Sequence, residues 1–186
     1  MRITTGKYKG RKVAAPKGIR PTQDKTRKAL FDILQSMQGV SFLELYAGSG
    51  AVGLEAASRG AREVALVEYN RDCLKVISNN IDSMKERACR VYPLQADKAI
   101  KMFCQRGKEF DIIFLDPPYH KDLGKKTLQT LSSCDILAEN GFIIVQHFKK
   151  DSLPDALGDL TLFRQSHYGD TVLSFYKKLA TGQTSS

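Results

Sequence analysis

The sequence lacks the features of exported, membrane-spanning and disulfide-bonded proteins. No apolar run approaches the length of a membrane span, and the first seven residues lack the apolar segment of a signal peptide. The four cysteines are widely spaced and form no C-x-x-C pair, which argues against a disulfide framework or a zinc site. We therefore expect a soluble, cytoplasmic protein with reduced, buried thiols and no bound metal.

Acidic residues are nearly absent from the first 40 positions. Asp24 and Asp32 face ten Lys and Arg there, so this segment carries a net charge of +8 and the rest of the chain only +1. Cations interleaved with an aromatic and glycines are typical of an arm that contacts phosphates, although a solvated surface would look similar. The candidate contacts are Lys7, Lys9, Arg11, Lys12, Arg20 and Arg27.

Strand and helix patterns alternate along the chain, whose 186 residues suit one domain. Thr22 is a candidate helix cap, and we expect helices over 23–37, 51–59, 71–87, 98–106 and 123–137. The expected strands are 40–45, 63–67, 90–94, 111–115, 141–147, 160–166 and 171–177. This repeated βα order predicts an α/β fold with a doubly wound, mostly parallel sheet, and the last two strands read as a hairpin.

A glycine-rich segment at 48–53, G-S-G-A-V-G, follows a predicted strand and opens a predicted helix. Glu68 lies twenty residues after its first glycine, a spacing also found in dinucleotide-binding proteins. Glu44, Asp97 and Asp116 are expected at neighbouring strand ends, where four carboxylates would repel a pyrophosphate. S-adenosylmethionine carries a sulfonium and an ammonium and no phosphate, so the acidic crevice favours it.

Each of these carboxylates also has a structural alternative. Glu44 could accept backbone N–H groups in the turn, Glu68 could pair with Arg71, and Asp97 could cap the helix that it precedes.

The tetrapeptide Asp116-Pro117-Pro118-Tyr119 ends the apolar run 111–115. In an open α/β sheet ligands bind at such strand ends. The Asp116 carboxylate and the Pro117 carbonyl can accept hydrogen bonds from a flat NH₂ group, the prolines stiffen the loop, and Tyr119 can stack on a base. A plain strand-ending turn is the alternative.

Together these motifs resemble the class I S-adenosylmethionine-dependent methyltransferases. The chain is most similar to the RsmD-type guanine-N2-methyltransferases of bacterial small-subunit (16S) ribosomal RNA. The matching segments are 6–11, 20–22, 27, 29–31, 44–50, 115–119, 147, 168–171 and 173–176. The departures are Gln95-Ala96-Asp97, which lacks a usual glycine, Gln146 where Glu is common, and Lys25 where Arg is common.

The resemblance implies a Rossmann-like seven-stranded sheet with an antiparallel last strand. It implies that Glu68 binds the cofactor ribose, that Asp97 binds the adenine amino group, and that Glu44 lies nearby. It further implies that the methionine moiety is bound by the backbone of Gly48, Ser49 and Gly50. The corresponding boundaries are a basic arm at 1–21 within the same domain, a methyltransferase domain at 22–178 and a disordered tail at 179–186.

Four questions remain open from the sequence. His147 could face the target base or be a hydrogen-bonded strand-end histidine, and Tyr8 could stack on RNA or pack. The substrate could be DNA rather than ribosomal RNA, because amino-methylating DNA enzymes share the Asp-Pro-Pro-Tyr type of motif. The chain could also be an RNA-binding module that keeps the fold without catalysis.

Overall fold

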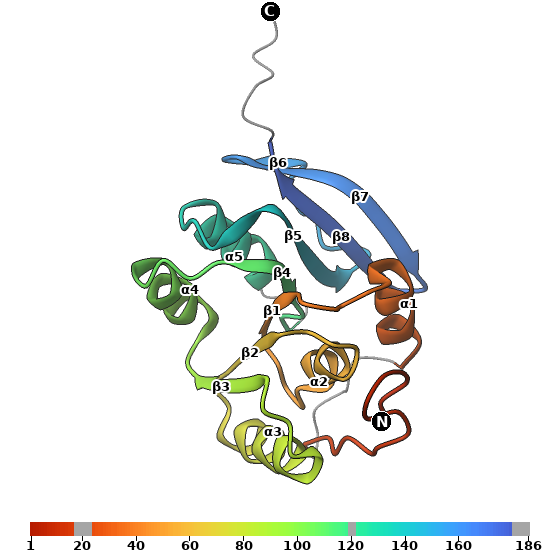
Figure 1. The fold of residues 1–186 in the computed structure, drawn as a ribbon. Coiled ribbons are helices and arrows are strands. Elements are labelled where there is room, and N and C mark those ends of the chain that lie inside the picture. Colours follow the sequence, from red (N-terminus) through yellow and green to blue (C-terminus); the bar gives the residue numbers. More distant parts are fainter. Residues whose placement is uncertain (17–23, 119–121, 180–186) are drawn as a thin grey trace, which may run out of the picture.

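The computed structural model describes residues 1–16, 24–118 and 122–179, which form one sheet flanked by helices (Figure 1). The strands are β1 (Ser41–Leu45), β2 (Glu63–Glu68), β3 (Cys89–Pro93), β4 (Phe110–Leu115), β5 (Leu137–Phe148), β6 (Ala156–Leu157), β7 (Leu160–Tyr168) and β8 (Thr171–Lys178). The helices are α1 (Asp24–Leu34), α2 (Ala51–Ser58), α3 (Arg71–Met84), α4 (Ala96–Gln105) and α5 (Leu123–Ser132).

The sheet has the order β3-β2-β1-β4-β5-β8-β7-β6. The first five strands in this order pair in parallel, whereas β8 lies antiparallel between β5 and β7. The predicted doubly wound, mostly parallel sheet with an antiparallel last strand is confirmed. An eighth strand, the two-residue β6, adds to the predicted seven at the edge beside β7.

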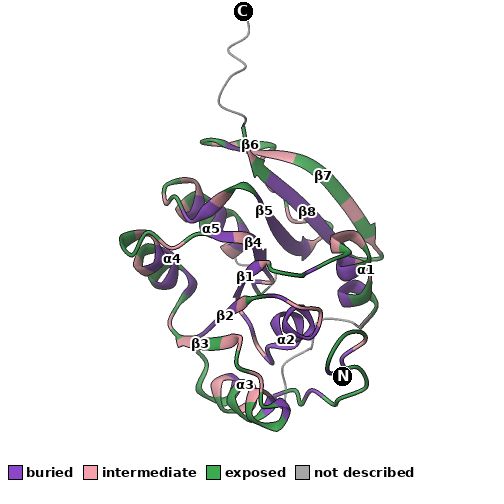
Figure 2. Cartoon of the chain, viewed as in Figure 1, coloured by how far each residue is buried: buried purple, intermediate pink, exposed green. Residues whose placement is uncertain are grey.

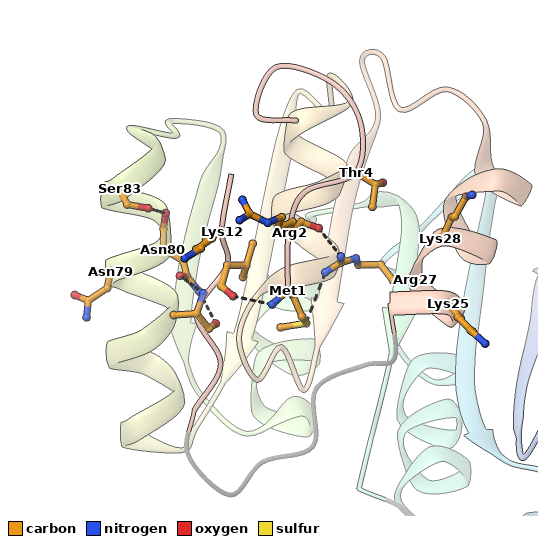
Figure 3. Close-up of a pocket in the computed structure, with 12 residues that line it drawn as sticks. Met1, Arg2, Thr4, Lys12, Lys25, Arg27, Lys28, Asn79, Asn80 and Ser83 are labelled. Carbon is orange, nitrogen blue, oxygen red and sulfur yellow. Dashed lines mark hydrogen bonds between the residues drawn. The ribbon is translucent and has the colours of Figure 1, made fainter. Parts of the chain in front are cut away.

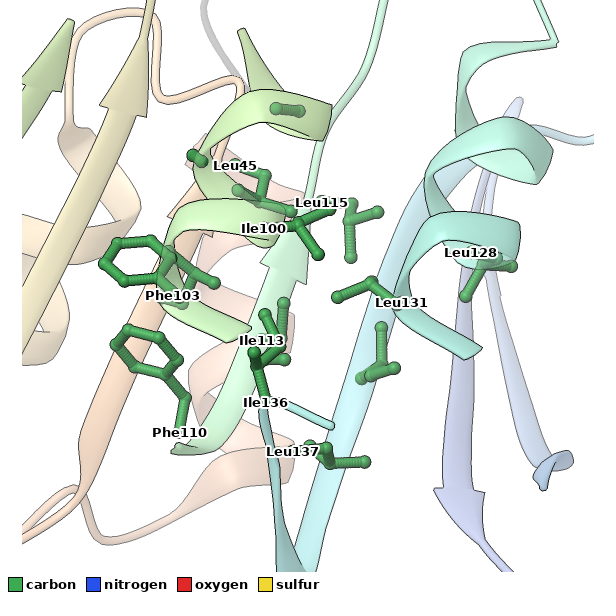
Figure 4. Close-up of a cluster of buried hydrophobic side chains, with 14 of the residues drawn as sticks. Leu45, Ile100, Phe103, Phe110, Ile113, Leu115, Leu128, Leu131, Ile136 and Leu137 are labelled. Atoms are coloured by element: carbon green, nitrogen blue, oxygen red, sulfur yellow. The ribbon is translucent and has the colours of Figure 1, made fainter. Parts of the chain in front are cut away.

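Helices cover both faces of the sheet because strand side chains alternate between the faces. Leu43 and Leu45 of β1 pack with Phe103 of α4 and Leu128 of α5 on one face (Figure 4). On the other face Phe42 belongs to a cluster built with α1, α2 and α3. Figure 2 shows β1 and α2 as buried, while much of β7 is exposed. The central strand ends are therefore held rigidly.

Three predicted helix ends were wrong, for local reasons. Helix α1 stops at Leu34 because Gln35 has a φ of +58°, and α3 stops at Met84 because Lys85 has a φ of +52°. Helix α5 stops at Ser132 instead of continuing to Leu137, which begins β5. The hydroxyls of Ser132 and Ser133 both donate to the Gln129 carbonyl at this end. The predicted cap Thr22 lies outside the described residues.

The N-terminal segment 1–16 packs against the domain. Arg2 and Lys12 form an antiparallel bridge within it, and Tyr8 is buried in a cluster with Leu54 of α2 and Met84 of α3. Tyr8 thus packs. None of the described helices is both long and apolar enough to cross a bilayer. The predicted disordered tail lies outside the described residues apart from Leu179, whose N–H donates to the Asp159 carbonyl (2.8 Å).

Candidate active site

The loop between β1 and α2 is shaped by left-handed backbone conformations. Tyr46, Gly48 and Gly50 have φ values of +64°, +57° and +72°, and the Gly50 N–H donates to the Ala47 carbonyl at 2.7 Å. A Cβ atom added to Gly48 would meet no atom within 4 Å. The loop therefore presents backbone to open space, where a ligand can approach it closely.

Glu44 lies beneath this loop at 3% exposure. Its Oε2 accepts the Gly53 N–H at 2.8 Å, and a Cβ atom on Gly53 would stand 2.9 Å from that oxygen, so the close contact requires glycine. Burial, partly offset by this hydrogen bond, raises the pKa of Glu44 to about 8. The charges of Asp116 and Glu68 raise this pKa further.

Glu68, at the end of β2, fastens the loop from the other side. Its Oε2 accepts the Gly48 N–H at 2.9 Å, and its Oε1 accepts the N–H groups of Tyr69 and Asn70 at 2.8 Å each. Among the described residues it makes no ion pair with Arg71, so that alternative is wrong. A carboxylate has about four lone-pair sites, so Glu68 can still accept bonds from a ligand hydroxyl.

Asp97 is exposed within the first turn of α4. The helix begins at Ala96 and its cap position is Gln95, so Asp97 does not cap the helix. Asp97 also contributes to the raised pKa of Tyr46, whose main cause is burial. Asp97 is therefore open to a ligand at this end of α4.

Asp116 begins the loop after β4. Its N–H donates to the Leu45 carbonyl at 3.4 Å, and its Oδ1 accepts the Gln146 Nε2–H at 2.8 Å. Pro117 is buried and Pro118 is exposed. Tyr119, predicted to stack on the base, lies outside the described residues.

The four carboxylates lie along one edge of the sheet. Leu45 pairs with Val67 on one side and Leu115 on the other, so β2, β1 and β4 end side by side, and β3 follows next in the sheet. The structure thus brings together the site residues expected there. The residues concerned are Glu44, Gly48, Ser49, Gly50, Glu68, Asp97, Asp116 and Pro117.

His147 is buried with both ring nitrogens engaged. Nδ1 lies 3.0 Å from the Phe148 carbonyl and Nε2 lies 2.8 Å from Ser174 Oγ. A carbonyl only accepts, so Nδ1 carries the proton and Nε2 accepts from the hydroxyl. Burial lowers the pKa of His147, which favours this neutral form. The strand-end interpretation therefore fits better than contact with the base.

The arm is fastened to α2 by buried polar groups. The Glu55 carboxylate, with no exposed surface, accepts the Thr4 N–H (2.8 Å), the Thr4 hydroxyl (2.6 Å) and the Thr5 N–H (3.1 Å). The Lys7 N–H donates to the Ser58 carbonyl at 2.8 Å. These hydrogen bonds fix the backbone of the arm, and four residues that we predict to contact phosphates lie on its surface. These four residues, all exposed, are Lys7, Lys9, Arg11 and Lys12.

Two other predicted RNA contacts have different outcomes. Arg27 is 1% exposed, and its guanidinium donates to the Arg2 carbonyl at 2.6 Å. Its buried guanidinium supports the arm and also lines a cavity between α1 and α3, so Arg27 stays a predicted RNA contact within that cavity and not on the exposed surface of the arm. Arg20 lies outside the described residues.

A basic cavity of about 950 Å³ lies between α1 and α3, with the arm crossing it (Figure 3). No Asp or Glu is among the described residues that line it. Its cations are Arg2, Lys12, Lys25, Arg27 and Lys28. A cavity whose described lining carries cations and no carboxylates suits phosphate groups.

The described residues offer no cluster of three His, Cys, Asp or Glu side chains that could hold a metal ion. All four cysteines are free; Cys73 is buried, and the other three are partly exposed.

The fold and this site can be compared with known proteins. A family model described as "Conserved hypothetical protein 95" matches residues 1–177. The chain belongs to this family. The match includes the arm, the glycine loop, Asp116-Pro117-Pro118 and the terminal hairpin.

Named relatives cover nearly the whole chain. "Putative rRNA methyltransferase YlbH" of Bacillus subtilis (strain 168) is 34% identical over 182 residues, 96% of this chain and 99% of that protein. "Ribosomal RNA small subunit methyltransferase D" of Escherichia coli (strain K12) is 32% identical over 187 residues, which cover 99% of this chain and 93% of that protein. The solved structure titled "Putative methyltransferase yhhF from Escherichia coli" has a TM-score of 0.84 at 32% identity and covers 97% and 99%. The resemblance inferred from the sequence is confirmed.

Two residues near the site were missed as contributors to it. Gln146 was noted only as a departure, yet it contacts Asp116 directly. Asn80 of α3 donates to the Ser49 carbonyl (3.0 Å) and the Ala14 carbonyl (3.1 Å), and accepts the Ala14 N–H (2.9 Å). It thereby joins the arm to the glycine loop. No sequence signal marks an asparagine for such a role.

Proposed function

We propose that this protein transfers a methyl group from S-adenosylmethionine to the exocyclic N2 amine of a guanine in 16S ribosomal RNA, acting on the small ribosomal subunit in the cytoplasm. Membership of the family and the names of its relatives support an rRNA methyltransferase. One observation carries the chemistry: Asp116 and Pro117 follow β4 directly beside the glycine loop, within a row of carboxylates.

The residues at this edge fit S-adenosylmethionine. The open side of Gly48 allows the cofactor's methionine part to approach the backbone, while Glu68 and Asp97 can accept bonds from ribose hydroxyls and the adenine amine. The carboxylates of Glu68, Asp97 and Asp116 favour a ligand with two positive charges, whereas Glu44, with its pKa raised to about 8, is mainly protonated at neutral pH. The bound cofactor supplies a methyl group already activated by a sulfonium.

Asp116 and Pro117 can prepare the target amine. The lone pair of the guanine N2 amine is delocalised into the ring, so it is a poor nucleophile. The Asp116 carboxylate and the Pro117 carbonyl can accept its two N–H groups, which localises the lone pair and orients it toward the methyl carbon. Such alignment can lower the activation barrier by about 7–11 kcal/mol. Asp116 can also take the proton that the amine loses.

The arm and the basic cavity supply RNA affinity. A guanine amine inside a duplex cannot be attacked in line, so the base must be unpaired or flipped out, which costs a few kcal/mol. The exposed arm cations and the basic cavity can offset this cost through phosphate contacts. Tyr119 remains our candidate for stacking on the base.

The test is transfer of tritium from labelled cofactor to three acceptors: naked 16S rRNA, immature small subunits and duplex DNA. We expect label in RNA or subunits, on guanine N2 by mass spectrometry. Label in DNA would instead support a DNA methyltransferase, and no label in any acceptor would support a non-catalytic binding module.

Asp116→Ala tests the role of the carboxylate. The variant should lose methyl transfer by a factor of at least about 100, because the amine acceptor and its alignment are removed. Cofactor affinity by calorimetry and RNA affinity by filter binding should be retained. Near-normal turnover would show that Asp116 is only a turn residue.

A further inference from the structure

Gln146 of β5 stands beside the proposed catalytic carboxylate. Strands β4 and β5 pair in parallel with Leu115 opposite Val145, so the next residues, Asp116 and Gln146, are neighbours across the sheet edge. The Gln146 Nε2 lies 2.8 Å from Asp116 Oδ1. A carboxylate oxygen can only accept from this amide, so the contact fixes which end of the amide faces Asp116.

The other end of this amide is left without a partner. Gln146 is 4% exposed, and its Oε1 is buried with no hydrogen-bond partner among the described residues. A buried acceptor of this kind lowers the stability of the fold. An apolar side chain of similar length would avoid that cost. The unpaired Oε1 adds nothing to stability, so the contact that this amide provides is the N–H donated to Asp116.

We infer that Gln146 is a positioning residue for Asp116, a role that rests on the proposed methyl transfer. Its N–H holds one carboxylate oxygen and so fixes the rotation of the carboxylate plane. A hydrogen bond to the ionised form also favours that form, which is the one able to accept from the target amine. An amide does not titrate, so it provides this donor at every working pH.

The first test replaces Gln146 by Met, which keeps the length of the side chain and removes the donor. The kcat for tritium transfer should fall about 10- to 100-fold, the cost of a misaligned catalytic group. The cofactor Kd and the Tm should not worsen, because the unpaired Oε1 is also removed. Gln129→Met, the same change at an exposed site on α5, should leave all three values unchanged.

The second test is Gln146→Glu, followed across pH. A glutamic acid can donate to Asp116 only while the pair holds a proton, so its kcat should fall as the pH rises and the proton is lost, because two like charges then stand side by side. The wild-type protein should lack this fall. Nearby titratable groups are the same in both proteins, so their effects cancel in the comparison. These groups are Glu44, Asp122, Lys125, His147 and Asp151.

The outcomes separate this role from the proposed function. If the wild-type enzyme is active but Gln146→Met leaves kcat unchanged, the role of Gln146 is overturned and the proposed function is not. The same holds if Gln146→Glu has the wild-type pH profile. A lowered Tm with matching losses of cofactor affinity would make Gln146 structural and also overturn it. A wild-type protein that methylates no nucleic acid would overturn the proposed function, and this role with it.

Discussion

The buried carboxyl group of Glu44 should make the stability of this protein depend on pH. Burial raises its pKa from the ordinary 4.5 to about 8 in the folded protein. Between these two values the folded state binds more protons than the unfolded state, so the free energy of unfolding falls as pH rises. The slope is about 1.4 kcal/mol per pH unit and the total at most about 5 kcal/mol, with no further change above pH 8.

Glu44→Gln isolates this effect, because glutamine keeps an oxygen for the Gly53 N–H and does not titrate. We expect urea unfolding from pH 5 to pH 8.5 to show the wild-type protein losing up to about 4 kcal/mol relative to the variant. All other titrating groups are shared and cancel. The control Glu139→Gln, at an exposed site, should track the wild type. If the difference in free energy of unfolding between the wild-type protein and Glu44→Gln stays constant over this range, Glu44 does not bind a proton in the way proposed.

Three further predictions concern the arm and the cofactor. Gly6→Ala should lower the urea midpoint by more than Gly10→Ala. Both glycines have φ +84°, which costs an alanine about 1–2 kcal/mol, but only the Cβ atom at position 6 would meet the Ser58 carbonyl oxygen, at 1.8 Å. Equal losses in the two variants would contradict the packing of the arm on α2. Replacing four exposed arm cations by Ala should flatten the salt dependence of log K for RNA by roughly two to three units, whereas equal slopes would show that RNA binds elsewhere. These cations are Lys7, Lys9, Arg11 and Lys12. Glu68→Ala should weaken cofactor binding by calorimetry about 10- to 100-fold, and an unchanged Kd would remove Glu68 from the site.

The sheet was predictable because its central strands β1, β2 and β4 are nearly continuous apolar runs between helical patterns. The helix ends were not predictable, because Gln35 and Lys85 adopt left-handed conformations that their residue types do not indicate. The hydrophobic pattern likewise extended α5 to Leu137, since a buried leucine serves either a helix or a strand.

The candidate site was predictable where chemistry follows strand ends. Motif spacing placed Glu68 and Asp116 beside the glycine loop, but it could not show that Glu44 lies beneath that loop. The charge pattern of the arm likewise could not separate exposed Lys7 from buried Arg27, because burial depends on how the arm packs.

The arm is better understood as part of the catalytic domain than as an appended RNA-binding tail. Its backbone is bound by Glu55 inside α2, the helix that the glycine loop opens. Asn80 bonds Ala14 of the arm and Ser49 of the loop with one side chain. Arm and loop therefore share one rigid support. RNA held by the arm cations would be placed in a fixed relation to the cofactor loop, which is what in-line transfer to a single amine requires.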